Sequence, residues 1–282
     1  MEKVTDNVYT ITTERGANPG IVFTKEGAVF VDTAQLLTTL LRMRKFALER
    51  GPIRYLINLE SHIDHIFGNH WFAGECPVIG HENLKKVFWK NPNYDCYDYS
   101  VDVLTRQDPE GLKFMPSKED FIVNGPSITF SERMELRLGD HHFQLFHTPG
   151  HTDNNICLLV PEERVLFTAD TVFAYCQTWL QVGNPLQWLE TLNFLKTLDF
   201  DRIVPGHGPV VGKDYLDVQI AFIYEWITSV AQGIAKGWTL MECQERISFA
   251  DRYPVDTGQE EMMPVIQEKN VKCLYNLLSN AK

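Results

Sequence analysis

The feature that most constrains this chain is a pattern that occurs four times: a short apolar strand followed by a loop that carries metal-ligand side chains. The ligand types are imidazole and carboxylate, and the residues are Glu60, His62, Asp64 and His65 in the first loop, then His151, Asp170 and His207. A two-metal hydrolytic site needs nitrogen and carboxylate ligands that converge from several loops. Because one accident does not produce the pattern four times, we predict that these residues surround a two-metal centre.

Apolar, β-branched runs predict the strands, and amphipathic segments predict the helices. The strands are expected at residues 8–11, 21–23, 28–31, 55–57 and 78–79, then at 143–146, 156–160, 165–167 and 202–204. Helices are expected at 35–50 and 185–198, the second with Asn184 as its cap and Pro185 in its first position. Asp32, between a strand and a helix, is interpreted as a helix cap.

The chain after residue 212 is predicted to be helical. Residues 214–236 form one long amphipathic helix that Gly237 ends, and residues 264–278 form another. Between them, Thr239 and Glu242 have the spacing of a capping box. Since no linker-like segment precedes this part, we predict an α/β domain over residues 1–212 with a helical C-terminal extension, residues 213–282, packed on it.

Residues 90–120 are rich in turn formers and tyrosine and show no clean periodicity. A long irregular stretch inside a compact protein is usually a lid, a binding loop or disordered. Its tyrosines could stack on a substrate or pack on each other, and they are Tyr94, Tyr97 and Tyr99. Trp179 and Trp188 are interpreted as packing residues. The remaining histidines are interpreted as ordinary surface or core residues, with His147 the best placed to support the site, and they are His70, His81, His141, His142 and His147.

Composition narrows the classes of partner. The net charge of −11 argues against nucleic acid, whose binding proteins normally display a basic face. No apolar run approaches the roughly 18–20 residues of a membrane span, and the N-terminus does not resemble a signal peptide. The six cysteines are scattered and are interpreted as reduced thiols. We expect a cytoplasmic protein with a small-molecule substrate, no nucleic-acid or membrane partner, and a homodimer as the assembly to test.

Four motifs, in order, resemble those of the metallo-β-lactamase superfamily, to which glyoxalase II-like hydrolases belong. Residues 60–65 read E-S-H-I-D-H where the family has H-x-H-x-D-H, and the later motifs are Thr148-Pro149-Gly150-His151-Thr152, Asp170 after a strand, and Pro205-Gly206-His207-Gly208. The resemblance covers roughly residues 5–212 and implies a four-layer αββα sandwich with the site at one edge. It also implies one metal on Glu60, His62 and His151, a second on Asp64, His65 and His207, and Asp170 as a bridge.

Glu60 stands where the family has a histidine, and it adds a third carboxylate to the set. Zinc is the usual metal of the family, but a hard oxygen ligand favours iron or manganese relative to zinc more than imidazole does. The expected cofactor is therefore two divalent metal ions, with iron and manganese as alternatives to zinc. The competing interpretation of Glu60 is a carboxylate near the site that does not bind metal.

The resemblance implies a metal-dependent hydrolase in which a metal-bridging hydroxide attacks an ester, thioester, lactone, lactam or phosphoester. Asp64 would orient the nucleophile and return a proton to the leaving group. One alternative is a flavodiiron-like redox protein that reduces oxygen or nitric oxide, but there a glutamate replaces the second histidine of the motif, which here is His62. The other alternative is a non-catalytic member that binds a ligand.

Overall fold

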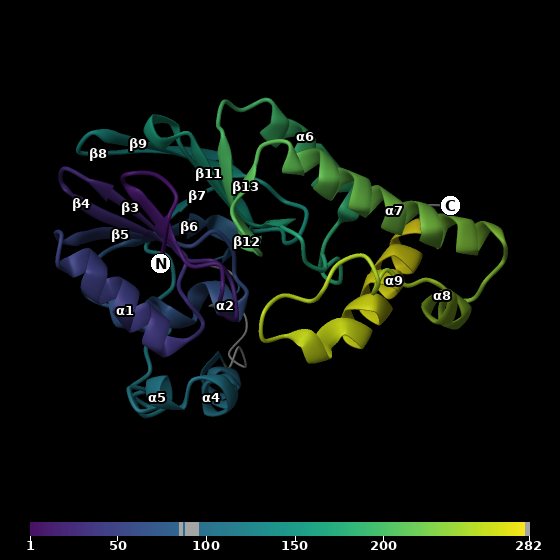
Figure 1. Cartoon of the computed structure of the whole chain (residues 1–282), viewed down its shortest axis with the longest axis horizontal. Helices are drawn as coiled ribbons and strands as arrows, with labels where there is room; N and C mark the ends of the chain where they lie inside the picture. The colour runs from purple at the N-terminus through teal and green to yellow at the C-terminus, as the bar shows by residue number, and fades with distance from the viewer. Residues whose placement is uncertain (85–86, 88–95, 280–282) are drawn as a thin grey trace.

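The structure is a computed structural model that describes residues 1–84, 87 and 96–279 (Figure 1). Its first sheet has seven strands in chain order, antiparallel from β1 to β4 and parallel from β4 to β7. These strands are β1 (Glu2–Lys3), β2 (Val8–Thr10), β3 (Gly20–Thr24), β4 (Gly27–Val31), β5 (Ile53–Ile57), β6 (Val78–His81) and β7 (Ile128–Phe130). The parallel part places the ends of β4 and β5 at the same edge.

The second sheet has six strands in the order β13-β12-β11-β10-β9-β8. Neighbouring strands are antiparallel except for the parallel pair β11 and β12. The strands are β8 (Arg133–Leu138), β9 (His141–His147), β10 (Ile156–Val160), β11 (Val165–Phe173), β12 (Arg202–His207) and β13 (Val211–Gly212). Because β11 and β12 run in the same direction, their carboxyl ends, which carry two of the predicted ligands, meet at one edge.

The helices cover the outer faces of the two sheets. On the side of the first sheet lie α1 (Leu37–Leu48), α2 (Ile63–Ile66), the 3-10 helix η1 (Phe67–Phe72), α4 (Cys96–Gln107) and α5 (Pro109–Leu112). On the side of the second sheet lie α6 (Pro185–Lys196) and α7 (Tyr215–Ala235), and beyond them α8 (Leu240–Arg246) and α9 (Met263–Ser279) (Figure 1). Two further 3-10 turns are η2 (Pro161–Glu163) and η3 (Glu260–Met262).

Alternation along β4 shows how the layers form. Phe30 faces α1 and packs with Leu40, whereas Val29 and Val31 face the second sheet and pack with side chains such as Leu158. This period of two buries both faces of the sheet, as expected for a sheet covered on both sides. A third cluster, which includes residues of α6 and α7, covers the outer face of the second sheet. The fold is therefore the predicted four-layer αββα sandwich with a C-terminal helical extension.

Several predicted elements are confirmed in detail. Asn184 caps α6 by accepting from the backbone N–H groups of Leu186 and Gln187, and Pro185 begins the helix. Thr239 and Glu242 form the predicted capping box of α8. In the extension, α7 packs against α6 and α9. The boundary between residues 212 and 213 stays a prediction, because α7 shares one apolar cluster with α6 and the second sheet.

Residues 90–120 differ from the predicted irregular stretch. Within the described part, residues 96–107 form α4, whose buried positions are Cys96, Ser100, Val103 and Leu104. That spacing is helical, but the small polar Ser100 occupies one of the buried positions. A search for periodic apolar residues therefore misses this helix. Tyr94 lies outside the described residues.

Two smaller predictions are also wrong. Asp170 lies within β11 rather than on a loop after it, at a place where the strand is irregular and Ala169 takes a left-handed φ of 43°. Asp32 does not cap α1, whose N-cap residue is Leu36. Among the described residues, no helix is both long and apolar enough to span a bilayer.

Candidate metal centre

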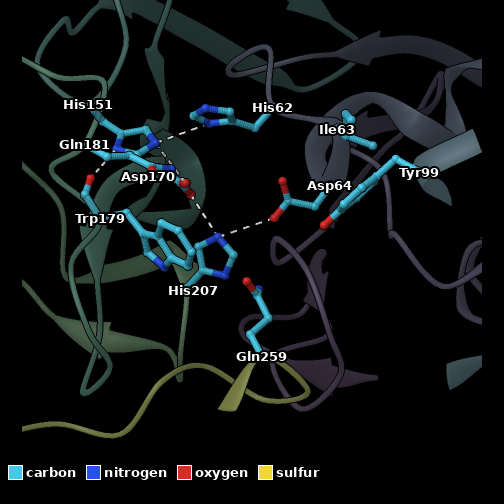
Figure 2. Close-up of a pocket in the computed structure, with 10 residues that line it drawn as sticks. All are labelled: His62, Ile63, Asp64, Tyr99, His151, Asp170, Trp179, Gln181, His207 and Gln259. Carbon is cyan, nitrogen blue, oxygen red and sulfur yellow. Dashed lines mark hydrogen bonds and ion pairs between the residues drawn. The ribbon is translucent and has the colours of Figure 1, made fainter. Parts of the chain in front are cut away.

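Five segments bring the predicted ligands together, and Figure 2 shows five of these side chains around one space. Glu60 follows β5, His62 precedes α2, and Asp64 and His65 lie in its single turn. The short α2 turns the chain so that neighbouring residues of one motif point into the same space. From the second sheet come His151 on the β9–β10 loop, Asp170 in β11 and His207 at the end of β12.

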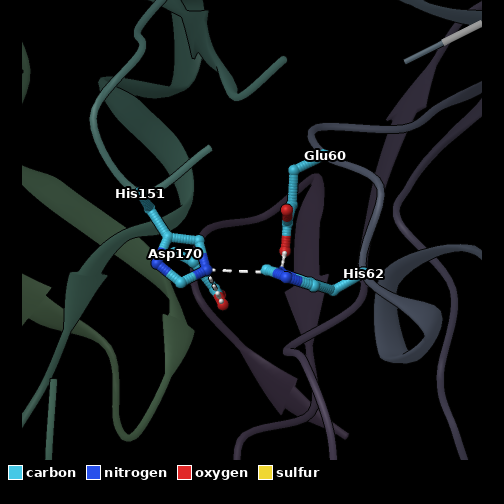
Figure 3. A group of neighbouring side chains, drawn as sticks. All are labelled: Glu60, His62, His151 and Asp170. Atoms are coloured by element: carbon cyan, nitrogen blue, oxygen red, sulfur yellow. Dashed lines mark hydrogen bonds and ion pairs between the residues drawn. The ribbon is translucent and has the colours of Figure 1, made fainter. Parts of the chain in front are cut away.

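The ligand atoms form two groups. The first consists of Glu60, His62, His151 and Asp170 (Figure 3), and the second of Asp64, His65 and His207. Within each group the ligand atoms lie within 4.8 Å of one another. Each group mixes imidazole nitrogen with carboxylate oxygen, which is a set suited to zinc, iron or manganese. The structure thus brings together all seven residues predicted from the sequence, while their roles as ligands stay a prediction.

Asp170 lies between the two groups. Its Oδ2 is 3.2 Å from His151 Nε2, and its Oδ1 is 3.1 Å from His65 Nε2 and 3.3 Å from His207 Nε2. One carboxylate therefore presents one oxygen to each group, an arrangement compatible with the predicted bridging role. A Cβ at Gly206 would collide with Asp170 Oδ1 and the Ala169 backbone, so glycine in that motif is required by this close approach.

Glu60 points inward and is completely buried. Its Oε1 lies 2.7 Å from His62 Nδ1 and 3.1 Å from His65 Nε2, and its Oε2 has no hydrogen-bond partner. A buried carboxylate oxygen without a partner is costly unless another group compensates it. A divalent cation between these residues would do so, and the donor set therefore fits a metal ion.

Carboxylates hold two of the histidines from behind. Asp32 Oδ2 lies 2.8 Å from His65 Nδ1, and Asp256 Oδ2 lies 2.8 Å from His207 Nδ1. Such contacts fix the ring orientation and the tautomer, and they leave Nε2 facing the interior of the site. Asp32 also accepts from the Leu59 backbone N–H at 2.7 Å, so its role is to support this edge of the sheet rather than to cap a helix.

His151 is held by a backbone carbonyl. Its Nδ1 lies 3.0 Å from the Trp179 carbonyl oxygen, and its ring packs edge-on against Trp188 at 5.3 Å between centroids. Trp188 is fully buried, as predicted, but Trp179 also lines the cavity described below. Asp256 and the Trp179 carbonyl carried no sequence signal, since both lie far from the motifs along the chain.

The histidines outside the two ligand groups make structural contacts of their own. His81 and His147 stack on each other at 3.9 Å between ring centroids, and His147 Nε2 faces the Asp153 carbonyl oxygen rather than a predicted ligand. His141 lies between Asp140 and Glu163. These contacts are structural, so the supporting role considered for His147 is taken by other residues.

Acidic and basic side chains in the site shift one another's pKa values. Burial opposes ionisation of Glu60, but the charges of His62 and His65 outweigh it and lower its pKa to about 2. Burial also opposes the charge on His62, yet Glu60 raises its pKa to about 9. For Asp32 burial dominates and raises the pKa to about 6 despite the charge of His65. The compact set of carboxylates thus stabilises protonated imidazoles. The same negative charge also attracts divalent cations.

A cavity of about 250 Å³ opens onto both groups. Besides the predicted ligands, the residues that line it are Ile63, Tyr99, Trp179, Gln181 and Gln259 (Figure 2). Tyr99 comes from α4, and Gln259 comes from the C-terminal extension. Tyr97 instead packs on Phe121 and donates to the Pro116 carbonyl oxygen. Residues 90–120 and the C-terminal extension therefore contribute one described residue each to the cavity lining.

The αββα sandwich and its two ligand groups define a metal-binding protein of the metallo-β-lactamase type. The sequence model of the metallo-beta-lactamase superfamily matches residues 12–207, which is more than half of the 282 residues. This chain belongs to the metallo-beta-lactamase superfamily. The family membership expected from the four motifs is confirmed.

Two curated relatives illustrate the likeness. The beta-lactamase-like protein 2 homolog of Caenorhabditis elegans is 27% identical over 220 residues, which cover 76% of this chain and 65% of that protein. A hydroxyacylglutathione hydrolase of Maricaulis maris is 31% identical over 113 residues, which cover 39% of this chain and 44% of that protein. The chain thus spans from less than half to about two thirds of the length of these relatives.

Solved structures show the same fold. The stereoselective inverting sec-alkylsulfatase from Pseudomonas sp. superposes with a TM-score of 0.68 at 16% identity, over 98% of this chain and 49% of that one. At such low identity the likeness concerns the fold alone. The family match and the ligand cluster together indicate a superfamily member with a candidate metal site.

Proposed function

We propose that the protein is a two-metal hydrolase of small acyl substrates, which are esters, thioesters or lactones. The observation that carries the proposal is the convergence of seven ligand-type side chains into two adjoining groups beneath one cavity. When bound, the divalent ions supply Lewis acidity and acidify a water molecule. Zinc follows from the family, and Glu60 adds iron and manganese as candidates.

Asp64 is the group that we assign to proton transfer. It lines the cavity, its side chain is 18% exposed, and its Oδ2 lies 3.5 Å from His207 Nε2. A carboxylate in this position can orient a water molecule, accept its proton and pass that proton to a leaving group. The neighbouring His65 is fully buried and offers no such access.

The cavity lining supports the choice of substrate. Beyond the ligand groups, it consists of apolar, aromatic and amide side chains, and within the described part of the chain it includes no Lys or Arg. Sites for phosphoesters normally present such cations to the substrate. Phosphoesters are therefore the second choice. The hydroxyacylglutathione hydrolase among the relatives supports an acyl substrate by its name.

The experiment is a metal analysis combined with a substrate panel. Protein prepared without added zinc should carry close to two transition-metal ions per chain and should hydrolyse at least one of a thioester, an ester and a lactone. Chelation should abolish the activity, and the matching metal should restore it. Protein that binds less than half an equivalent after incubation with zinc, manganese and iron would disprove the proposal.

We also propose a reducing compartment, the cytoplasm, since all six cysteines carry thiols rather than disulfides.

A further inference from the structure

The segment between α8 and η3 returns from the C-terminal extension to the metal centre (Figure 2). Gln259 of this segment lines the cavity, and Asp256 contacts His207 behind it. The Asp256 side chain is 11% exposed and that of His207 is 6% exposed, so this contact is shielded from solvent. An ionic hydrogen bond in such a place is stronger than one at the surface.

The segment is held on both sides of Asp256. Before it, Gln177 donates through its backbone N–H to the Pro254 carbonyl at 2.9 Å and through Nε2 to the Tyr253 carbonyl at 2.7 Å. After it, the Gly258 carbonyl accepts from Arg15 and, at 2.9 Å, from Gln107 Nε2. These contacts come from three separate parts of the chain, and they fix the position of the Asp256 carboxylate.

The other contacts of His207 do not determine which of its ring nitrogens faces the ligand group. Its ring stacks on Phe173 at 5.1 Å with an interplanar angle of 6°, and its carbonyl accepts from the Ala174 N–H. Stacking fixes the plane of the ring but does not decide which ring nitrogen faces the ligand group. Asp256 decides it, because its carboxylate lies 2.8 Å from Nδ1, accepts a hydrogen bond from that nitrogen and so directs Nε2 at the second ligand group.

We propose that Asp256 is a positioning residue, which holds His207 so that its Nε2 is directed at Asp64 and Asp170. This inference rests on the proposed function, since it assigns Nε2 to the second ligand group. In this inference the C-terminal extension positions a ligand residue of the site in addition to lining the cavity. Asp256 does for His207 what Asp32 does for His65, but it comes from a different part of the chain.

The test compares Asp256→Ala and Asp256→Asn with the wild type and with the control Asp251→Asn, an exposed position on the same segment. Zinc affinity is measured for each equivalent by competition with a chromophoric chelator. Cobalt absorption spectra and melting of the metal-free protein are recorded in parallel. Asp256→Ala should weaken one of the two equivalents by about 10–100-fold, as is typical when such a supporting partner is lost, and alter the cobalt spectrum. Asp256→Asn should weaken it less, because its amide oxygen still accepts a hydrogen bond.

Wild-type affinity for both equivalents in Asp256→Ala would overturn the inference and leave the proposed function standing. Lower melting of the metal-free protein with unchanged affinity would also overturn it, since that result assigns a purely structural role. Should Asp256→Ala not fold, the isosteric Asp256→Asn decides, and an affinity and a cobalt spectrum equal to those of the wild type overturn the inference. A wild-type protein that binds no metal would instead disprove the proposed function.

Discussion

The two ligand groups differ in how their histidines are held. In the second group, His65 and His207 are backed by carboxylates at 2.8 Å, and their side chains are 0% and 6% exposed. In the first group, His151 is backed by a neutral carbonyl, and the side chain of His62 is 37% exposed. The first group also contains Glu60, whose Oε2 has no hydrogen-bond partner. One group is rigid and basic, and the other is more open and richer in oxygen.

The difference assigns separate tasks to the two groups. A carboxylate behind an imidazole raises its basicity and fixes its orientation, so the second group should hold its metal more tightly. The first group, with a hard oxygen ligand and an exposed imidazole, should decide which metal is preferred. Substitutions in each group test this division of tasks.

Asp64→Ala should give the largest effect, because Asp64 belongs to the second group and also reaches the cavity. We expect kcat to fall by at least about 100-fold on any accepted substrate, as for loss of a general acid–base group. Steady-state kinetics on protein reloaded with metal measure this, with Asp102→Ala on the exposed face of α4 as the control. Activity within a few fold of the wild type would remove Asp64 from the chemistry.

Asp32→Asn should weaken the tighter metal equivalent by about 10–100-fold, because His65 loses its charged partner. Chelator competition measures the two affinities separately. The exposed Asp6→Asn serves as the control. If the weaker equivalent changed instead, the second group would not be the tighter one, and the comparison above would be reversed.

Glu60→His should restore three imidazoles to the first group and change metal preference. Zinc affinity should rise relative to manganese and iron, because imidazole is softer than carboxylate and carries no charge. The acidic limb of the pH–rate profile should move down by a fraction of a pH unit or more, since the more positive site acidifies bound water. Metal competition and pH profiles run on both proteins test this. Equal selectivity in the two would show that Glu60 does not bind metal.

The smallest effect concerns the metal-free protein. Glu60 raises the pKa of His62 from 6.5 to about 9 against the opposing effect of burial. The folded state therefore binds this proton more tightly than the unfolded state, and the resulting stability is present below about pH 6.5 and lost as pH rises towards 9. The melting temperature of metal-free protein should fall over that window, and the fall should be shallower in His62→Gln. An identical slope in both would contradict the assignment.

The motifs predicted much of this protein because they are local. Glu60, His62, Asp64 and His65 lie within six residues, and the strand before them and the turn after them place them together. Asn184 and Pro185 predicted the start of α6 for the same reason, because a helix cap acts on the first turn of its own helix. Local patterns failed where burial did not follow hydrophobicity, as at Ser100 in α4.

The residues of the motifs show which ligand types are present and the unusual carboxylate at Glu60, and their resemblance to a known family implied the sandwich of two sheets. How the ligands are supported depends on the tertiary structure. Asp32 meets His65 because β4 and β5 are parallel neighbours, and Asp256 meets His207 across 49 positions of chain because the extension folds back over the site. No periodicity records such contacts, since a hydrogen bond between distant segments depends on how the layers pack and leaves no repeating pattern in either segment.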